Sequence, residues 1–245
     1  MRRTALAAVC LATAAAAGLT GCLSGADTAP KGPFAGLSGG QIADRAMKTT
    51  TKATTLRMRG TVTDGGDDIK IDMALSKKGE CAGTMGMGGK GSADLIKSGD
   101  TIYMKYNEAF LRDQGKGESK ADTDAVVNMM ADKWTKMAAT GKDAKDIAGF
   151  CDLDTVLAGA VDVNSDATRG KTTTIDGTPA ITLHEKDGKD RYTLYVATKG
   201  KPYLLRVDSS AGAKEPVHLS FLDYEKPVEA KKPAGKILDL DALGG

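Results

Sequence analysis

The chain has 245 residues, with 34 lysines and arginines against 32 aspartates and glutamates, so its formal net charge is only +2. Two of the arginines, Arg2 and Arg3, lie in an N-terminal segment without acids, and removing them from the 34 leaves 32 charges of each sign. This balance removes the usual electrostatic argument for a nucleic-acid partner or a strongly anionic surface, although a local patch can still bind an anionic lipid head. The length suits one good-sized core and also allows two domains.

Residues 1–21 have the organisation of a secretory signal peptide. A short basic head precedes the uncharged apolar stretch 5–19, which is shorter than the roughly 20 residues of a membrane-spanning helix. The stretch ends in Leu19-Thr20-Gly21-Cys22, which resembles the bacterial lipobox. In that family of signals the cysteine is diacylated and the signal is cut before it, so the resemblance implies lipidation of Cys22. The alternative is a plain secreted protein with an incidental cysteine.

Acylation of Cys22 would hold the protein at the extracytoplasmic face of the cell membrane. Each buried methylene group contributes about 0.8 kcal/mol, and two acyl chains give a stable anchor where one gives marginal binding. Residues 22–38 are rich in Gly, Pro and small residues, so we expect an acylated N-terminus followed by a flexible tether. The single folded domain is then expected over 39–245.

The remaining cysteines suggest one disulfide. Cys10 leaves with the signal and Cys22 is acylated, so Cys81 and Cys151 remain as an even pair in an oxidising compartment. We expect a bridge between them, with two buried free thiols as the alternative. Closing a loop of about 70 residues would stabilise the fold by roughly 4 kcal/mol.

The first half of the domain alternates between apolar and polar residues. Residues 41–53 suit a short helix, after which 56–63 and 69–75 read as a hairpin around a polar turn. The alternation continues through 80–87, and 91–106 adds two short strands around a turn at 98–100. We therefore predict a run of antiparallel strands.

The centre has a different period. Residues 109–124 are predicted to form a polar, charged loop, and 152–160 a short helix. Helical spacing over 124–139 predicts a covering helix capped by Thr123 or Asp124. Its apolar stripe consists of Val126, Met130, Trp134, Met137 and Ala138.

Four further stretches with a period of two, 172–177, 179–197, 201–209 and 216–224, predict strands separated by glycine-containing turns. The order strands, helices, strands indicates an α+β fold with one strongly curved antiparallel sheet and helices covering its concave face.

Two segments add a family resemblance. Residues 219–240 run from a strand through Asp-Tyr and Lys-Pro-Val to a closing apolar run, and 98–111 have the sequence SGDTIYMKYNEAFL. With the lipobox and the element order, the chain resembles the LppX/LprG group of actinobacterial lipoproteins, which have the LolA/LolB-like fold. The resemblance covers about residues 41–240. It implies a half-barrel sheet whose helices enclose an apolar cavity, and a role in carrying acylated lipids or lipoglycans across the envelope.

The family has no binding motif whose residues could be matched in this sequence. The candidate cavity residues are therefore the apolar residues on the face of each strand that would point into the half-barrel. A methionine or aliphatic residue in such a stripe is also what an ordinary filled core contains. The candidates are Met58, Val62, Ile69, Ile71, Met73, Met85, Ile102, Met104, Leu194 and Val196 from the strands, with Val126, Met130 and Trp134 from the covering helix.

Nothing in the sequence points to catalysis, a cofactor or a metal. The chain has no Gly-x-Ser-x-Gly motif, and His184 and His218 lie in separate predicted strands. The stretch 83–92 departs from a phosphate-binding loop at two positions, and Met85-x-Met87 fits a strand face better than a copper site. We therefore expect a non-enzymatic lipoprotein that binds, and in the fuller hypothesis transports, an acylated lipid or glycolipid. The alternative is an envelope interaction or sensor protein with a filled core; the export partner is unknown.

Overall fold

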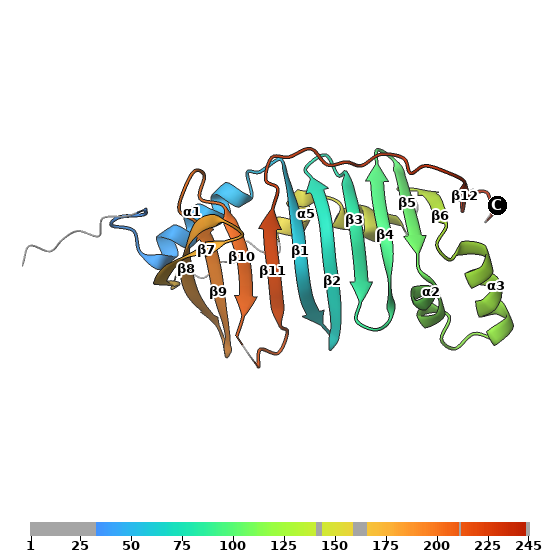
Figure 1. The fold of residues 1–245 in the computed structure, drawn as a ribbon, viewed down its shortest axis with the longest axis horizontal. Helices are drawn as coiled ribbons and strands as arrows, with labels where there is room; N and C mark the ends of the chain where they lie inside the picture. Colours follow the sequence, from blue (N-terminus) through green and yellow to red (C-terminus); the bar gives the residue numbers. More distant parts are fainter. Residues whose placement is uncertain (1–32, 141–143, 159–165, 211, 244–245) are drawn as a thin grey trace, which may run out of the picture.

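The computed structural model describes residues 33–140, 144–158, 166–210 and 212–243, and these form one large β-sheet with helices against it (Figure 1). The predicted signal peptide, Cys22 and most of the predicted tether lie outside the described residues. Within the described part the sheet has twelve strands. They are β1 (Thr55–Asp64), β2 (Asp67–Ser76), β3 (Cys81–Met87), β4 (Gly91–Ser98), β5 (Thr101–Tyr106), β6 (Trp134–Ala138), β7 (Thr168–Ile175), β8 (Thr178–Asp187), β9 (Asp190–Ala197), β10 (Leu204–Ser209), β11 (Val217–Leu222) and β12 (Ile237–Asp239).

Two antiparallel meanders make up this sheet. The strand order is β12-β6-β5-β4-β3-β2-β1-β11-β10-β9-β8-β7. In this order β1 to β6 lie beside their neighbours in sequence and form one meander, and β7 to β11 form the other in the same way. The meanders join where β1 pairs with β11, with Met58 opposite Phe221. Among the twelve strands of the described residues, β12 alone pairs in parallel with another strand, β6. The predicted α+β fold with a mostly antiparallel sheet is therefore confirmed.

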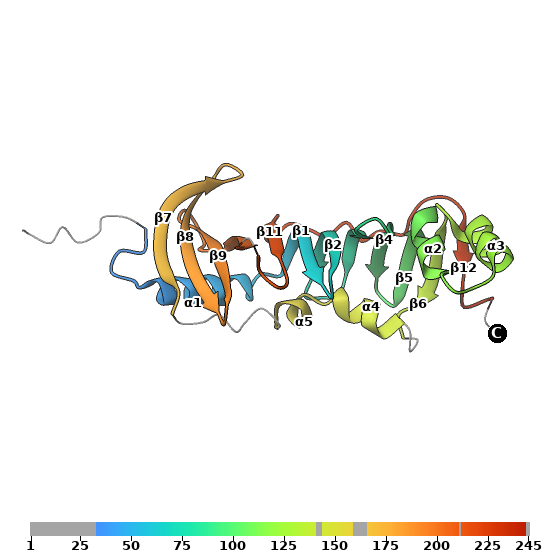
Figure 2. The same cartoon turned by 90° about the horizontal axis from the view of Figure 1, so that it is seen from below.

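The strong curvature predicted for the whole sheet is not found. The edge strands β7 and β12 lie at opposite ends of an elongated molecule, and bending is concentrated in β7 to β9 (Figure 2). Register shifts between Arg169 and Thr172 and between Leu204 and Arg206 lie in this part of the sheet. Such bulges increase local bend and twist, so the curvature stays local.

Within the described residues, five helices lie against the sheet. They are α1 (Gly39–Thr50), α2 (Glu108–Gln114), α3 (Lys120–Met130), α4 (Ala144–Phe150) and α5 (Leu153–Ala158). Helices α1, α5 and α4 follow one side of the sheet, and α2 and α3 lie at the end near β5 and β6 (Figures 1 and 2). Helix α1 begins with a capping box in which Ser38 and Gln41 bond reciprocally, and its apolar side contacts β7 to β10.

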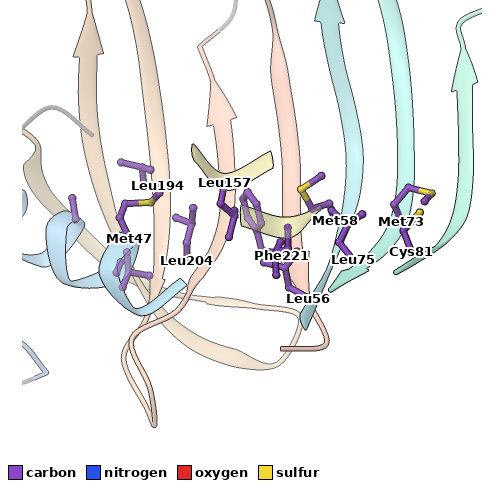
Figure 3. Packing of buried hydrophobic residues seen from close by; sticks show 14 of the residues in the cluster. Met47, Leu56, Met58, Met73, Leu75, Cys81, Leu157, Leu194, Leu204 and Phe221 are labelled. Carbon is purple, nitrogen blue, oxygen red and sulfur yellow. The ribbon is translucent and has the colours of Figure 1, made fainter. Parts of the chain in front are cut away.

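The core occupies the sheet face that α1 and α5 cover. Register places Met58, Met73, Gly83, Leu95 and Met104 in one row across β1 to β5. Met73 is fully buried, with its sulfur over Gly83, where a Cβ atom would lie 2.8 Å from Sδ. In Figure 3 side chains from the sheet, α1 and α5 gather in one apolar layer. The strand alternation therefore produces one continuous apolar face.

The opposite face of the sheet carries charged and hydroxyl side chains. Arg59 bonds to Asp72 at 3.1 Å, Thr84 donates to Asp94 at 2.8 Å, and Lys105 lies 2.8 Å from the same carboxylate. These residues also belong to one register row, so neighbouring strands compensate each other's charge.

The central elements differ most from prediction. The helix predicted over 124–139 is two elements, since α3 ends at Met130 and β6 begins at Trp134. Asp132 between them has a φ of 56°, a left-handed conformation that ends helical continuation. The N-cap is Ser119 rather than Thr123 or Asp124, and the predicted loop 109–124 contains most of α2 and the first turn of α3.

Candidate ligand-binding groove

A groove of about 680 Å³ lies where the apolar sheet face extends past α5 toward α2, α3 and α4. Most of its lining is apolar. The lining residues are Ile69, Met85, Gly86, Met87, Ala93, Leu95, Met104, Tyr106, Phe110, Leu111, Gln114, Val126, Met130, Asp146, Ile147 and Phe150. A volume of this size falls in the range of small-molecule sites in proteins.

Strands β2 to β5 form the floor of the groove. Antiparallel register places Ile69 opposite Met87, and Met85 opposite Ala93, whose other neighbour is Tyr106. Because alternate residues of a strand share a face, these side chains all point toward the groove. The same alternation that builds the core therefore continues where the core ends.

Helix α2 is fixed over β4 by the side chain of Asn107. Its Oδ1 accepts from the amides of Phe110 (2.9 Å) and Ser92 (3.1 Å), so one residue caps α2 and ties it to the strand. Gly91 permits this approach, because a Cβ atom there would lie 2.1 Å from the Phe110 nitrogen. Phe110 in turn stacks on Tyr106, with ring centroids 5.4 Å apart. Hydrogen bonds to Asn107 and the contact between two aromatic rings therefore fix α2, which forms this wall of the groove, against β4 and β5.

Two further contacts hold the other walls. Arg112 of α2 reaches Asp124 of α3 at 2.8 Å, which joins these two helices. Cys151, directly after α4, forms a disulfide with Cys81 at the start of β3, with the Cα atoms 5.1 Å apart. The bridge predicted from the cysteine count is present in the structure and holds the end of α4 against the sheet.

Few polar groups line the groove. Tyr106 donates to the Met104 sulfur at 3.0 Å, and burial raises the pKa of its phenol. The Gln114 amide and the Asp146 carboxylate complete the polar set. The rest of the lining offers dispersion contacts only, so an apolar ligand with one polar end matches it.

Five of the predicted cavity residues line this groove, and eight do not. The five are Ile69, Met85, Met104, Val126 and Met130. Buried in the core instead are Met58, Met73, Ile102, Leu194 and Val196. Val62 and Ile71 are half-buried on the same sheet face but outside the lining.

The prediction that Trp134 lies on the covering helix is wrong. Trp134 lies in β6 opposite Lys105, whose ammonium is 5.2 Å from the ring centroid. Its neighbour Thr135 pairs with Met104, so Trp134 points to the charged face of the sheet. Trp134 therefore contributes to a cation–π contact and not to the groove.

The sequence did not predict the other lining residues, which come from both strands and helices. The strands contribute Gly86, Met87, Ala93, Leu95 and Tyr106, and the helices contribute Phe110, Leu111, Gln114, Asp146, Ile147 and Phe150. Phe110 and Leu111 of α2 lie in a segment predicted as a loop, and α4 was not predicted. Ile147 and Phe150 are three residues apart, which is typical of apolar residues on one face of a helix. This spacing could have predicted α4.

Neither histidine lies in the groove lining. His184 is in β8 beside Thr193 of β9, and His218 of β11 lies 3.3 Å from Asp208. In the part of the chain that the structure describes, no cluster of three or more His, Cys, Asp or Glu side chains could hold a metal ion. No helix among the described residues is long and apolar enough to cross a membrane.

Comparison with solved structures identifies the fold. LprF from Mycobacterium bovis is 13% identical, with a TM-score of 0.52 over 80% of this chain and 97% of LprF. Two weaker matches are an uncharacterized conserved protein from Thermus thermophilus (10% identity, TM-score 0.33, 81% and 96% covered) and the MucA/MucB complex of Pseudomonas aeruginosa (13%, 0.33, 80% and 61%). No family model and no curated sequence matches the chain. The LprF match shows a shared fold, in agreement with the predicted resemblance to the LppX/LprG group.

Proposed function

We propose that this chain is an envelope lipoprotein, anchored through Cys22, that binds and carries an acylated lipid or glycolipid in the groove between the sheet and α2, α3 and α4. The observation that carries the proposal is the lining, in which only Gln114, Asp146 and the Tyr106 hydroxyl are polar. Burying apolar surface stabilises a bound chain by roughly 25 cal/mol per Å² without any charged contact. The fold shared with LprF, together with the resemblance of the sequence to the LppX/LprG group of lipoproteins, supports the same function.

The groove volume limits how much lipid can enter. A methylene group occupies roughly the 30 Å³ that one water molecule takes in the liquid. A groove of about 680 Å³ therefore holds on the order of 20 methylene groups, which corresponds to one long acyl chain. Further chains of the same lipid would remain outside the groove. The ligand we propose is accordingly a lipid that inserts one chain and leaves its head group near Gln114 and Asp146.

Retention of lipid by protein purified from the envelope tests the proposal. Native mass spectrometry followed by organic extraction should find co-purifying acyl lipid in the parent protein. Met104→Trp should fill space that the lipid uses, so lipid retention falls while the melting temperature stays nearly unchanged. Met73→Trp, in the same register row but fully buried, is the matched control. It should overpack the core and cost about 1–3 kcal/mol.

The same measurements decide against the alternative of an interaction or sensor protein. If the parent protein carries no acyl lipid, and Met104→Trp lowers stability as much as Met73→Trp, the groove is not a binding site for a chain. The interaction protein would then be the better explanation. The proposal assigns no catalytic residue and no cofactor.

A further inference from the structure

A second concave surface lies along α1, at the opposite end of the sheet from the apolar groove (Figure 1). It encloses about 550 Å³, and its cations are Arg45 and Lys48 of α1, Lys52 just after the helix, and Lys201 between β9 and β10. We call these four residues the basic face. Nothing in the proposed lipid-binding function accounts for it.

The helical period of α1 creates this surface. Ile42, Ala43, Ala46 and Met47 are buried, which fixes the side of the helix that meets the sheet. Arg45 and Lys48 then point away from the sheet and are exposed, and Lys52 is exposed in the following turn. Three cations thus gather within eight residues of chain.

The acids that line the surface do not neutralise it. Asp44 and Glu225 are the two acidic residues there, against four cations. The Glu225 carboxylate already accepts from the Thr54 hydroxyl (2.5 Å), the Thr54 amide (3.1 Å) and the Tyr203 hydroxyl (3.0 Å), and it lies 3.7 Å from Lys201. Arg45, Lys48 and Lys52 have no side-chain partner among the described residues.

Several lysines elsewhere on the molecule are paired with acidic side chains. Lys90, Lys105 and Lys136 lie within 2.6–2.8 Å of Asp67, Asp94 and Asp239, respectively. In a chain whose charges balance beyond residue 21, the excess positive charge at α1 is therefore local. An anionic surface provides the complementary charge.

We propose that the basic face binds the anionic phospholipid head groups of the membrane that carries the protein. Helix α1 begins at Gly39, 17 positions after Cys22. Residues 33–38 are held in place, because Arg169 donates to the carbonyl oxygens of Phe34 and Leu37. If the 11 positions from Cys22 to Pro33 form the flexible tether that the sequence predicts, they span roughly 17–20 Å on average, so an anchor at Cys22 would keep α1 close to the bilayer surface. This placement rests on the proposed anchor, whereas the charge argument does not. Bilayer contact at α1 orients the molecule, a property separate from what the groove binds.

Vesicle binding of the full chain carrying Cys22→Ala tests this inference, because that chain has no acyl group at residue 22. Binding to phosphatidylcholine vesicles is compared with binding to vesicles that also contain phosphatidylglycerol. The apolar residues 5–19 are present in both arms, so only the response to lipid charge matters. We expect tighter binding to the anionic vesicles, and a loss of that preference as salt rises.

Charge-neutral variants then locate the surface. The triple change Arg45→Gln, Lys48→Gln and Lys52→Gln should reduce binding to anionic vesicles at least tenfold. The control triple, Lys70→Gln, Lys214→Gln and Lys232→Gln, removes the same charge from exposed lysines outside the basic face and should have a much smaller effect. All six positions are exposed, so melting temperatures should agree and report equal folding.

Two results would overturn the inference: equal binding to neutral and anionic vesicles, or an equal loss in the two triple variants. The second would show a response to net charge alone. Lipid retention in the groove of the Arg45, Lys48 and Lys52 variant should equal that of the parent. A failure of the basic face is therefore separable from a failure of the groove.

Discussion

Glu225 joins three parts of the chain at the start of the segment between β11 and β12. Its carboxylate accepts from the hydroxyl and amide of Thr54, just before β1, and from the hydroxyl of Tyr203, just before β10. Tyr203 stacks on Tyr224 with ring centroids 3.9 Å apart. The segment that follows passes across the ends of the strands from β1 to β5 and reaches β12 (Figure 1). One ionised side chain therefore fixes where this segment departs.

The charge of Glu225 should make stability depend on pH. The Thr54 hydroxyl, and next the Thr54 amide, hold the pKa of this carboxyl below its usual range. A lowered folded-state pKa means that the carboxylate stabilises the fold above the unfolded-state pKa, and that this contribution disappears as pH falls through the folded-state value. Glu225→Gln should therefore lower the melting temperature near pH 7 and have little effect at strongly acidic pH.

Thermal melting across this pH range checks the prediction. Glu229→Gln is the matched control, because Glu229 lies in the same segment and its carboxylate pairs with exposed Lys231. Its melting curve should follow the parent at every pH. An equal effect of Glu225→Gln at neutral and acidic pH would show that the amide disturbs packing and that ionisation is not the cause.

For single residues, the sequence predicted which side of the sheet a side chain lies on. It did not predict whether that side chain belongs to the core or to the groove. Alternation correctly placed Met73, Met85 and Met104 on one side of the sheet, since a strand offers only two sides. It could not show that α5 and the core bury Met73 while Met104 faces a groove. That difference depends on which helix covers each strand, and tertiary packing decides it.

At the scale of elements, the segment from α3 to β6 shows how one pattern fits two structures. Val126, Met130 and Trp134 recur at helical spacing, and the stretch Trp134–Ala138 also alternates as a strand does. Pairing with β5 on one side and β12 on the other favours the strand. These partners lie far away in the sequence, so local periodicity could not anticipate the choice.

The disulfide is the element-scale feature that positions α4. Cys81 begins β3 and Cys151 follows α4, and both side chains are fully buried. Replacing both by Ala should lower the free energy of unfolding by roughly 4 kcal/mol, because the bridge closes a 70-residue loop in the unfolded chain. Urea unfolding of the parent and the double variant measures this difference.

Chemical mapping provides the companion measurement. Non-reducing peptide mapping of protein taken directly from the envelope should find the Cys81 and Cys151 peptides joined. Recovery of two alkylatable thiols would contradict the bridge. Since α4 contributes Ile147 and Phe150 to the groove, we also expect the double variant to retain less acyl lipid.

For the whole molecule, the pairing of β1 with β11 determines the architecture. It joins an N-terminal meander, which carries the groove, to a C-terminal meander, against which α1 packs. The sequence predicted the strands of both meanders except β6, but not this junction, because the pairing brings together segments from opposite ends of the domain. A Cβ atom at Gly60 would lie 1.9 Å from the His218 carbonyl oxygen, so glycine at that position permits the close approach.

Anchoring is the remaining whole-molecule prediction. Cys22 precedes the domain expected over 39–245, so we expect Cys22→Ala to remove the proposed acyl chains and to leave the fold of the described residues unchanged. Two acyl chains, at about 0.8 kcal/mol per buried methylene group, account for stable membrane attachment. The variant should therefore lack the lipid modification and its acyl-dependent attachment, while purified variant and parent melt at the same temperature.

Cys10→Ala, which changes the other cysteine of the N-terminal region, should remain acylated and membrane-bound. Acylation detected by mass spectrometry in Cys22→Ala would reject the lipobox assignment and, with it, the anchor on which the orientation through α1 partly rests.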